Sequence, residues 1–247
     1  MKNPKTAIIA CKTVIEEMGE LIPSDVEAHP VESGLHTKPD RLRTALQAMI
    51  DEITEDTDII ILGYGLCSMG VVGLKAADST LIIPRQEDCV SIFLGSRTAY
   101  REALHKEPGT YFLSKGWIDA GISLLEELKG MEDRYGRERA RRIMERMIQH
   151  YTRLAFIDMG YEEQEQYRRY AQKAADKLRL RYQEIRGTTR LLKRICRGPY
   201  DEEEFIIAPP AHVIRLEDFG LGISGKPRER TPAKKRQSAV EPGTNPV

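Results

Sequence analysis

The stretch DIIILGYGLC, residues 58–67, decides the fold. Its four consecutive aliphatic residues are typical of a β-strand that is buried on both faces, and the glycines that follow favour a tight loop. Two similar apolar runs, at residues 7–10 and 81–84, are equally short and rich in isoleucine. Such strands are characteristic of parallel sheets covered by helices, so the chain is expected to form one.

Helical segments alternate with strands along the rest of the chain. An apolar stripe with helical spacing is clearest at residues 42–53, which Asp40 is placed to cap. Further strands are expected at residues 109–113, 153–158, 180–185 and 204–208, and further helices at residues 13–20, 90–95, 99–105, 122–151, 162–179 and 188–197. This alternation predicts an α/β fold with one doubly wound, mostly parallel, Rossmann-like sheet that has helices on both faces.

The chain of 247 residues is long enough for a proper core, and a single α/β domain is expected over residues 1–221. Within it, residues 22–39 are rich in Pro, His, Ser and Gly and predict a loop over the sheet edge. Residues 225–247 carry six basic and two acidic residues among Gly, Pro, Ser and Thr. We therefore expect residues 222–247 to form a disordered basic tail.

The charge balance points away from several classes of partner. Lysine plus arginine and aspartate plus glutamate each number 38, so no global field would attract nucleic acid or an anionic membrane. No apolar stretch approaches the eighteen or so residues of a membrane-spanning helix, and the first strand follows a short N-terminus directly. A cytoplasmic protein without structural disulfides is expected.

Three of the four cysteines follow buried strands. Cys11, Cys67 and Cys89 each stand just past one of the three isoleucine-rich runs, and the carboxyl ends of parallel strands meet at one edge of a sheet. Three thiolates there would bind an iron–sulfur cluster or zinc, since soft ligands select soft metals, and helix N-termini would favour the thiolate form. The alternative is that each cysteine is a small core residue, as Cys196 is expected to be.

Several neighbours are candidates for the same site. His36, in the Pro-rich loop, is the best fourth metal ligand, although a solvated loop histidine is the commoner case. Arg85 and Arg97 flank Cys89 and could neutralise a thiolate cluster or hold a substrate, or could form ordinary salt bridges. Asp88 is a plausible helix cap.

The glycine-rich loop after residue 62 supplies the remaining candidates. Tyr64 and Ser68 are placed to line the pocket, and Gly63 and Gly65 permit a backbone path close to a ligand. Neither GxGxxG nor a Walker pattern is present, so a nicotinamide cofactor or ATP is not predicted.

Residues 61–67, 83–97 and 109–117 carry motifs that resemble an uncharacterised family, domain of unknown function 1638 (DUF1638). The similarity extends from residue 5 to about residue 212 and includes an early cysteine, a Leu-His pair at His36 and a Gly-Leu-Cys loop. Glu87 replaces the histidine of the family's Arg-x-His-Asp-Cys segment, so a ligand or proton donor there does not carry over.

The resemblance implies a place beside corrinoid-dependent methyltransferases, because members are often encoded near them. The arrangement is also distantly similar to 2-hydroxyacyl-CoA dehydratase subunits, in which three cysteines hold a cluster with an open iron. The leading hypothesis is thus a metal-binding protein, an enzyme or not, that serves corrinoid-dependent methyl transfer or one-carbon metabolism. The alternatives are a non-enzymatic accessory protein that binds a corrinoid protein or cofactor, and a metal-free thiol redox protein in which Cys67 and Cys89 form a disulfide.

Overall fold

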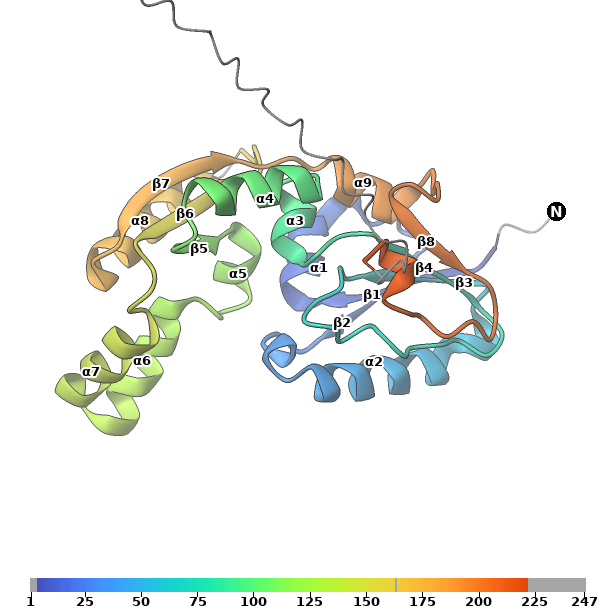
Figure 1. Cartoon of the computed structure of the whole chain (residues 1–247), viewed down its shortest axis with the longest axis horizontal. Coiled ribbons are helices and arrows are strands. Elements are labelled where there is room, and N and C mark those ends of the chain that lie inside the picture. The colour runs from blue at the N-terminus through green and yellow to red at the C-terminus, as the bar shows by residue number, and fades with distance from the viewer. Residues whose placement is uncertain (1–3, 163, 222–247) are drawn as a thin grey trace, which may run out of the picture.

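The computed structural model describes residues 4–162 and 164–221 and has the expected α/β class (Figure 1). A five-stranded sheet has the order β2-β1-β3-β4-β8, in which only β8 runs antiparallel to its neighbour. Its strands are β1 (Thr6–Cys11), β2 (Glu27–Val31), β3 (Ile59–Gly63), β4 (Thr80–Pro84) and β8 (Phe205–Ala208). The isoleucine-rich runs are therefore adjacent parallel strands, as predicted.

A second, three-stranded parallel sheet follows the order β5-β6-β7. Its strands are β5 (Thr110–Leu113), β6 (Arg153–Asp158) and β7 (Arg181–Arg186). The expectation of one continuous sheet is corrected here: after β4 the chain builds a separate sheet and returns to the first one at β8. Strand periodicity reports burial but not which strand edges pair, so it could not separate the two sheets.

The helices of the first half are α1 (Lys12–Met18), α2 (Pro39–Ile53), α3 (Cys89–Phe93) and α4 (Arg97–Lys106). Those of the second half are α5 (Lys115–Asp119), α6 (Leu124–Tyr135), α7 (Arg137–Met147), α8 (Gln164–Leu178) and α9 (Arg190–Arg197). Short 3₁₀ turns occupy Gly19–Leu21, Leu35–Thr37, Thr54–Asp56 and Glu217–Phe219. No helix in the described part of the chain is long and apolar enough to span a membrane.

Two predicted segments differ in detail. The helix expected over residues 122–151 is two helices, α6 and α7, because Gly136 lies between them with a φ of +77°. The loop expected over residues 22–39 contains β2, whose sequence EAHPV holds two polar residues and a proline. Such a strand is tolerated at a sheet edge, which is where β2 lies. The predicted basic tail lies outside the described residues.

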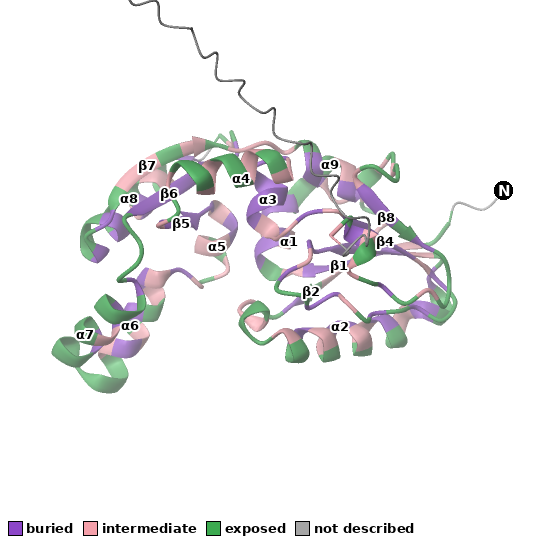
Figure 2. Ribbon diagram, viewed as in Figure 1, coloured by how far each residue is buried: buried purple, intermediate pink, exposed green. Residues whose placement is uncertain are grey.

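Alternating side chains bury both faces of the first sheet. On β1, Ile9 packs in the cluster beneath α2, whereas Ile8 and Ala10 belong to the cluster that includes α1 and α9. Most residues of β1, β3 and β4 are buried, and Figure 2 shows the outer side of α2 exposed. The helices on both faces are therefore those of a doubly wound sheet.

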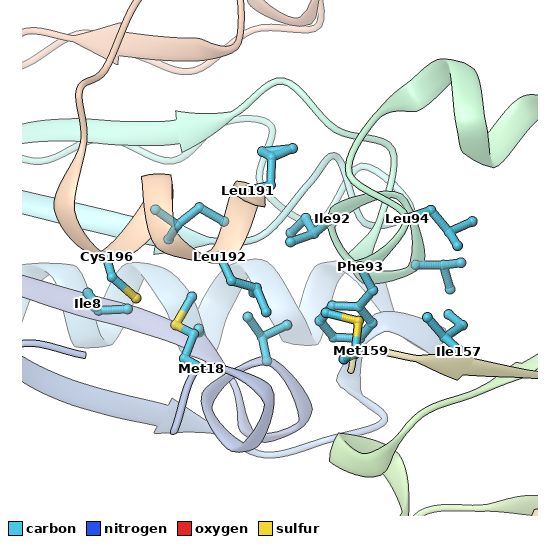
Figure 3. Packing of buried hydrophobic residues seen from close by; sticks show 14 of the residues in the cluster. Ile8, Met18, Ile92, Phe93, Leu94, Ile157, Met159, Leu191, Leu192 and Cys196 are labelled. Atoms are coloured by element: carbon cyan, nitrogen blue, oxygen red, sulfur yellow. The ribbon is translucent and has the colours of Figure 1, made fainter. Parts of the chain in front are cut away.

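One hydrophobic cluster joins the two sheets. It contains residues of β1, β3 and β4 together with Phe112 of β5 and Ile157 of β6. Figure 1 shows α3 between the sheets, and Figure 3 shows its Phe93 among Ile157 and Met159. Cys196 also packs here, near Ile8, and is 3% exposed, which agrees with its predicted role in the core.

Candidate functional site

Three strand ends bring Cys11, Cys67 and Cys89 to one pocket. Cys11 is the last residue of β1, Cys67 follows β3, and Cys89 is the first residue of α3 after β4. All three line a cavity of about 20 Å³, together with Tyr64 and His36. Parallel pairing of β1 with β3 and of β3 with β4 produces this convergence, as expected for the carboxyl edge of such a sheet.

The loop that carries Cys67 has a strained backbone. Cys67, Ser68 and Met69 have φ values of 47°, 56° and 71°, the left-handed region that costs non-glycine residues roughly 1–2 kcal/mol each. The backbone N–H groups of Leu66 and Cys67 anchor the loop by donating to the carbonyls of Gln86 and Glu87, at 2.8 and 2.9 Å. Strain of this kind concentrates at functional sites, where surrounding contacts hold it in place.

Cys89 is held by a capped helix start. The Asp88 carboxylate accepts a hydrogen bond from the Ser91 N–H at 3.0 Å, and the Ser91 hydroxyl accepts one from the Asp88 N–H at 3.1 Å. This reciprocal capping box confirms the predicted role of Asp88. It also ties Cys89 to the 86–88 backbone against which the Cys67 loop is bonded.

The Cys67 and Cys89 thiols are neutral rather than ionised. Burial raises the pKa of Cys67 to about 12, and the Cys11 thiol and the Asp88 carboxyl add to the shift. Burial also raises the pKa of Cys89 well above its ordinary value. The expected thiolate preference from the helix N-terminus is therefore wrong for the protein without a bound cation, because desolvation outweighs the dipole of a five-residue helix.

This charge state predicts slow alkylation of Cys67. A rise in pKa from 9.0 to about 12 lowers the thiolate fraction at pH 8 roughly 1,000-fold relative to the unfolded chain. We expect iodoacetamide labelling, followed by peptide mass spectrometry, to accelerate about tenfold for each pH unit up to pH 10 in the native protein. The same reaction in denaturant is the control, and an equal rate in both states at pH 8 would contradict the prediction.

Tyr64 brings a buried polar group without a partner into the pocket. Its side chain is 4% exposed, and within the described residues its hydroxyl makes no hydrogen bond. Burial first, and then the three cysteine thiols, raise its pKa, so the phenol is neutral. An unsatisfied buried hydroxyl costs free energy and calls for an explanation such as a bound group.

His36 lies at the rim of the pocket, in the 3₁₀ turn Leu35–Thr37. Its ring is partly covered, and this burial lowers its pKa, which favours the neutral imidazole that can bind a metal. The Cys11 sulfur lies 3.6 Å from the Ser33 hydroxyl in the same segment. The segment after β2 therefore closes the pocket from above the sheet edge.

A larger cavity of about 370 Å³ adjoins the thiol pocket and shares His36, Cys67 and Cys89 with it. Ser68 lies on its wall, and much of the remainder is aromatic: Tyr100, Tyr111, Phe112, Trp117 and Tyr151. Sequence reasoning missed these rings, because most of them belong to the second sheet and its connections. Only the packing of the two sheets against a shared core brings these rings to the cysteines.

The two predicted arginines do not line the pocket. The Arg85 guanidinium donates to the backbone carbonyls of Phe205, at 3.1 Å, and Asp218. Arg97 donates to the Phe219 carbonyl at 2.9 Å and lies 3.7 Å from Glu87. Both side chains hold the last described turn against the first sheet, so they are not placed to neutralise the thiols.

The two predicted glycines line the thiol pocket and also satisfy packing. A Cβ on Gly63 would lie 2.6 Å from the Ala10 Cβ, and one on Gly65 would lie 2.7 Å from the Gln86 carbonyl oxygen. Gly65 thus permits the close approach of the Cys67 loop to residues 86–88.

The described side chains do not form a complete metal site as they stand. Among residues 4–162 and 164–221, no group of three or more His, Cys, Asp or Glu side chains has the spacing to hold a metal ion. The three thiols share a pocket without converging on one point, so metal binding would need side-chain rotation.

A family model matches residues 31–196, which include the Cys67 loop, the Cys89 segment and His36. The chain belongs to the family described as protein of unknown function (DUF1638). No curated protein and no solved structure matches the chain. Cys11 lies outside the matched residues, although the structure places it in the same pocket as the two cysteines inside them.

Proposed function

We propose that this protein binds a thiophilic metal ion through Cys11, Cys67 and Cys89. The observation that carries the proposal is the meeting of three thiols, from three separate strand ends, in one pocket. Core packing does not require cysteine at three equivalent strand ends, whereas a shared ligand does. The strained left-handed turn at Cys67 and the unpartnered Tyr64 hydroxyl support a binding role at the same place.

The size of the pocket favours a single ion. A cavity of about 20 Å³ accommodates roughly one water-sized sphere, so zinc is the first candidate. An iron–sulfur cluster, the second candidate, would require the loop at residues 66–69 to move outward. Three thiolates suit either centre, because both are soft.

The fourth ligand of a zinc ion would be the neutral His36 imidazole at the rim. A zinc ion held there would supply Lewis acidity, or would stabilise a thiolate as a nucleophile, next to the aromatic cavity. Because burial keeps the Cys67 and Cys89 thiols protonated, metal binding must release their protons, and metal affinity should rise with pH.

The test is metal binding by cysteine variants. We expect anaerobically purified protein to bind one zinc or cobalt(II) ion, with thiolate-to-cobalt charge-transfer absorption. Loss of a residue that only hydrogen-bonds to a metal ligand typically weakens metal binding ~10–100-fold. Cys67→Ser and Cys89→Ser remove a ligand itself, so they should weaken metal binding by more than this. Cys196→Ser is the matched control, since Cys196 lies in the core away from the pocket. Unchanged metal content in Cys11→Ser, Cys67→Ser and Cys89→Ser would overturn the proposal.

A second candidate is thiol redox chemistry. Cys67 and Cys89 both border the 370 Å³ cavity, whereas Cys11 does not, so two thiols face the space that a reactant would enter. Oxidation of Cys67 and Cys89 to a protein disulfide would transfer two electrons and two protons to a low-molecular-weight disulfide, which would be reduced to two thiols. Loss of two hydrogen atoms from a linked Cys67–Cys89 peptide, seen by mass spectrometry, would support this chemistry.

The link to corrinoid-dependent methyl transfer stays a prediction that rests on the family resemblance. A corrinoid protein or methyltransferase partner, whether the protein acts as an enzyme or as an accessory, would be tested by co-purification from the source cells. A cytoplasmic location is a further prediction, to be tested by cell fractionation.

A further inference from the structure

Three cavities that share lining residues, together called the cleft, extend from the thiol pocket to Tyr111 of the second sheet. The thiol pocket, the 370 Å³ cavity and a third cavity of about 500 Å³ all share His36. Tyr111 and Trp117 border both larger cavities. Each of these two has a volume typical of sites for small organic molecules, about 300–1,000 Å³.

The middle of the cleft is walled by aromatic rings that brace one another. The ring centroids of Tyr111 and Tyr151 are 5.9 Å apart in an edge-to-face pair, and those of Tyr100 and Phe112 are 6.1 Å apart. Trp117 packs edge-on against Phe93 of the shared core, at 5.4 Å. Such rings carry negative faces that attract cations as well as apolar groups.

The charged groups along the cleft are mostly acidic. Five carboxylates border its three cavities, against a single guanidinium, that of Arg134; they are Glu32, Glu87, Asp88, Glu126 and Glu127. Glu87 is bound by Arg101 at 2.7 Å and Glu126 by Lys129 at 2.6 Å. Within residues 4–162 and 164–221, Glu32 and Glu127 have no ion-pair partner. An anionic ligand would thus meet repulsion, whereas a cation would be attracted.

We propose that the cleft binds a small organic ammonium ion, with its charge among the aromatic rings and carboxylates and its remaining part directed to the thiol pocket. The buried, unpartnered Tyr64 hydroxyl lies in the thiol pocket, where it offers a hydrogen-bonding group to the remaining part of the ligand. The inference rests on the proposed function only in that the thiol pocket is taken as the place where the ligand reacts. Binding of the cation itself needs no metal.

The test compares a cation with its neutral isostere. Choline and 3,3-dimethyl-1-butanol have the same shape and differ in charge, and Trp117, the single tryptophan of the chain, reports on both by fluorescence. We expect saturable quenching by choline, with a dissociation constant roughly 10–30-fold lower than that of the isostere, as a partly desolvated cation–π site gives. Equal affinities, or no saturation by either compound, would overturn the inference.

Two variants of exposed residues test the wall without threatening the fold. Tyr151→Leu and Glu127→Gln should each weaken choline binding several-fold and leave isostere binding unchanged. Glu138→Gln on α7 changes the net charge equally but lies outside the cleft, so it should alter neither. An equal loss of choline affinity in Glu127→Gln and Glu138→Gln would show that the effect comes from the net charge of the protein, and it would contradict a binding site at Glu127.

Choline binding by Cys67→Ser separates the two proposals. Quenching that persists in this variant, while the wild type binds no metal, would retain the ammonium site and reject the metal function. Metal binding by the wild type, with no preference for choline over its neutral isostere, would retain the metal function and reject the ammonium site.

Discussion

Phe93→Ala is expected to lower the free energy of unfolding by about 3–5 kcal/mol, the range for removing a fully buried aromatic ring. Phe93 is 0% exposed and belongs to the cluster that joins both sheets. Its ring packs edge-on against Trp117, and its backbone carbonyl accepts a hydrogen bond from the Thr188 N–H at 2.9 Å. A cavity at this position would remove apolar contacts through which the two sheets stabilise each other.

Urea unfolding followed by Trp117 fluorescence measures this effect at the junction itself. Tyr135→Ala is the control, since this tyrosine is 48% exposed and its ring lies against the Arg134 and Arg139 guanidinium groups, and it should change stability by less than about 0.5 kcal/mol. A loss below about 1 kcal/mol for Phe93→Ala would mean that the two sheets do not depend on a common core.

The positions of the three cysteines could be predicted because they depend on a single property of parallel sheets. Isoleucine-rich runs identify buried strands, and the carboxyl ends of such strands share an edge, so Cys11, Cys67 and Cys89 had to approach one another once β1, β3 and β4 paired. His36 could be placed only as a loop residue, and the structure brings it to the rim of the same pocket.

The parts that sequence reasoning missed depend on pairing and burial. Arg85 and Arg97 flank Cys89 in sequence, but they bond carbonyls near residues 205 and 218–219, which lie far along the chain. The thiol pKa shifts depend on desolvation, which no local motif reports. The aromatic wall comes largely from the second sheet, whose separation from the first no periodicity indicates.

Gly65→Ala is expected to disable the thiol site by moving the backbone that places two of its three cysteines. A Cβ at this position would lie 2.7 Å from the Gln86 carbonyl oxygen and 2.8 Å from the Asp88 nitrogen. Both are backbone atoms that cannot rotate away, so the Cys67 loop and residues 86–88 must separate. The expected destabilisation is about 1–3 kcal/mol, as for other overpacked sites, together with at least tenfold weaker metal binding.

The matched control is Gly130→Ala in α6, where a Cβ would meet only the Arg134 guanidinium, at 3.7 Å. Alanine favours a helix by up to about 1 kcal/mol over glycine, so this variant should be as stable as the wild type or more so, with unchanged metal binding. The decisive measurement compares the loss of unfolding free energy with the loss of metal affinity in Gly65→Ala. Lower stability with unchanged metal affinity would show that the 65–67 loop serves packing alone. A metal site that depends on the geometry of this loop would lose affinity when the loop is displaced.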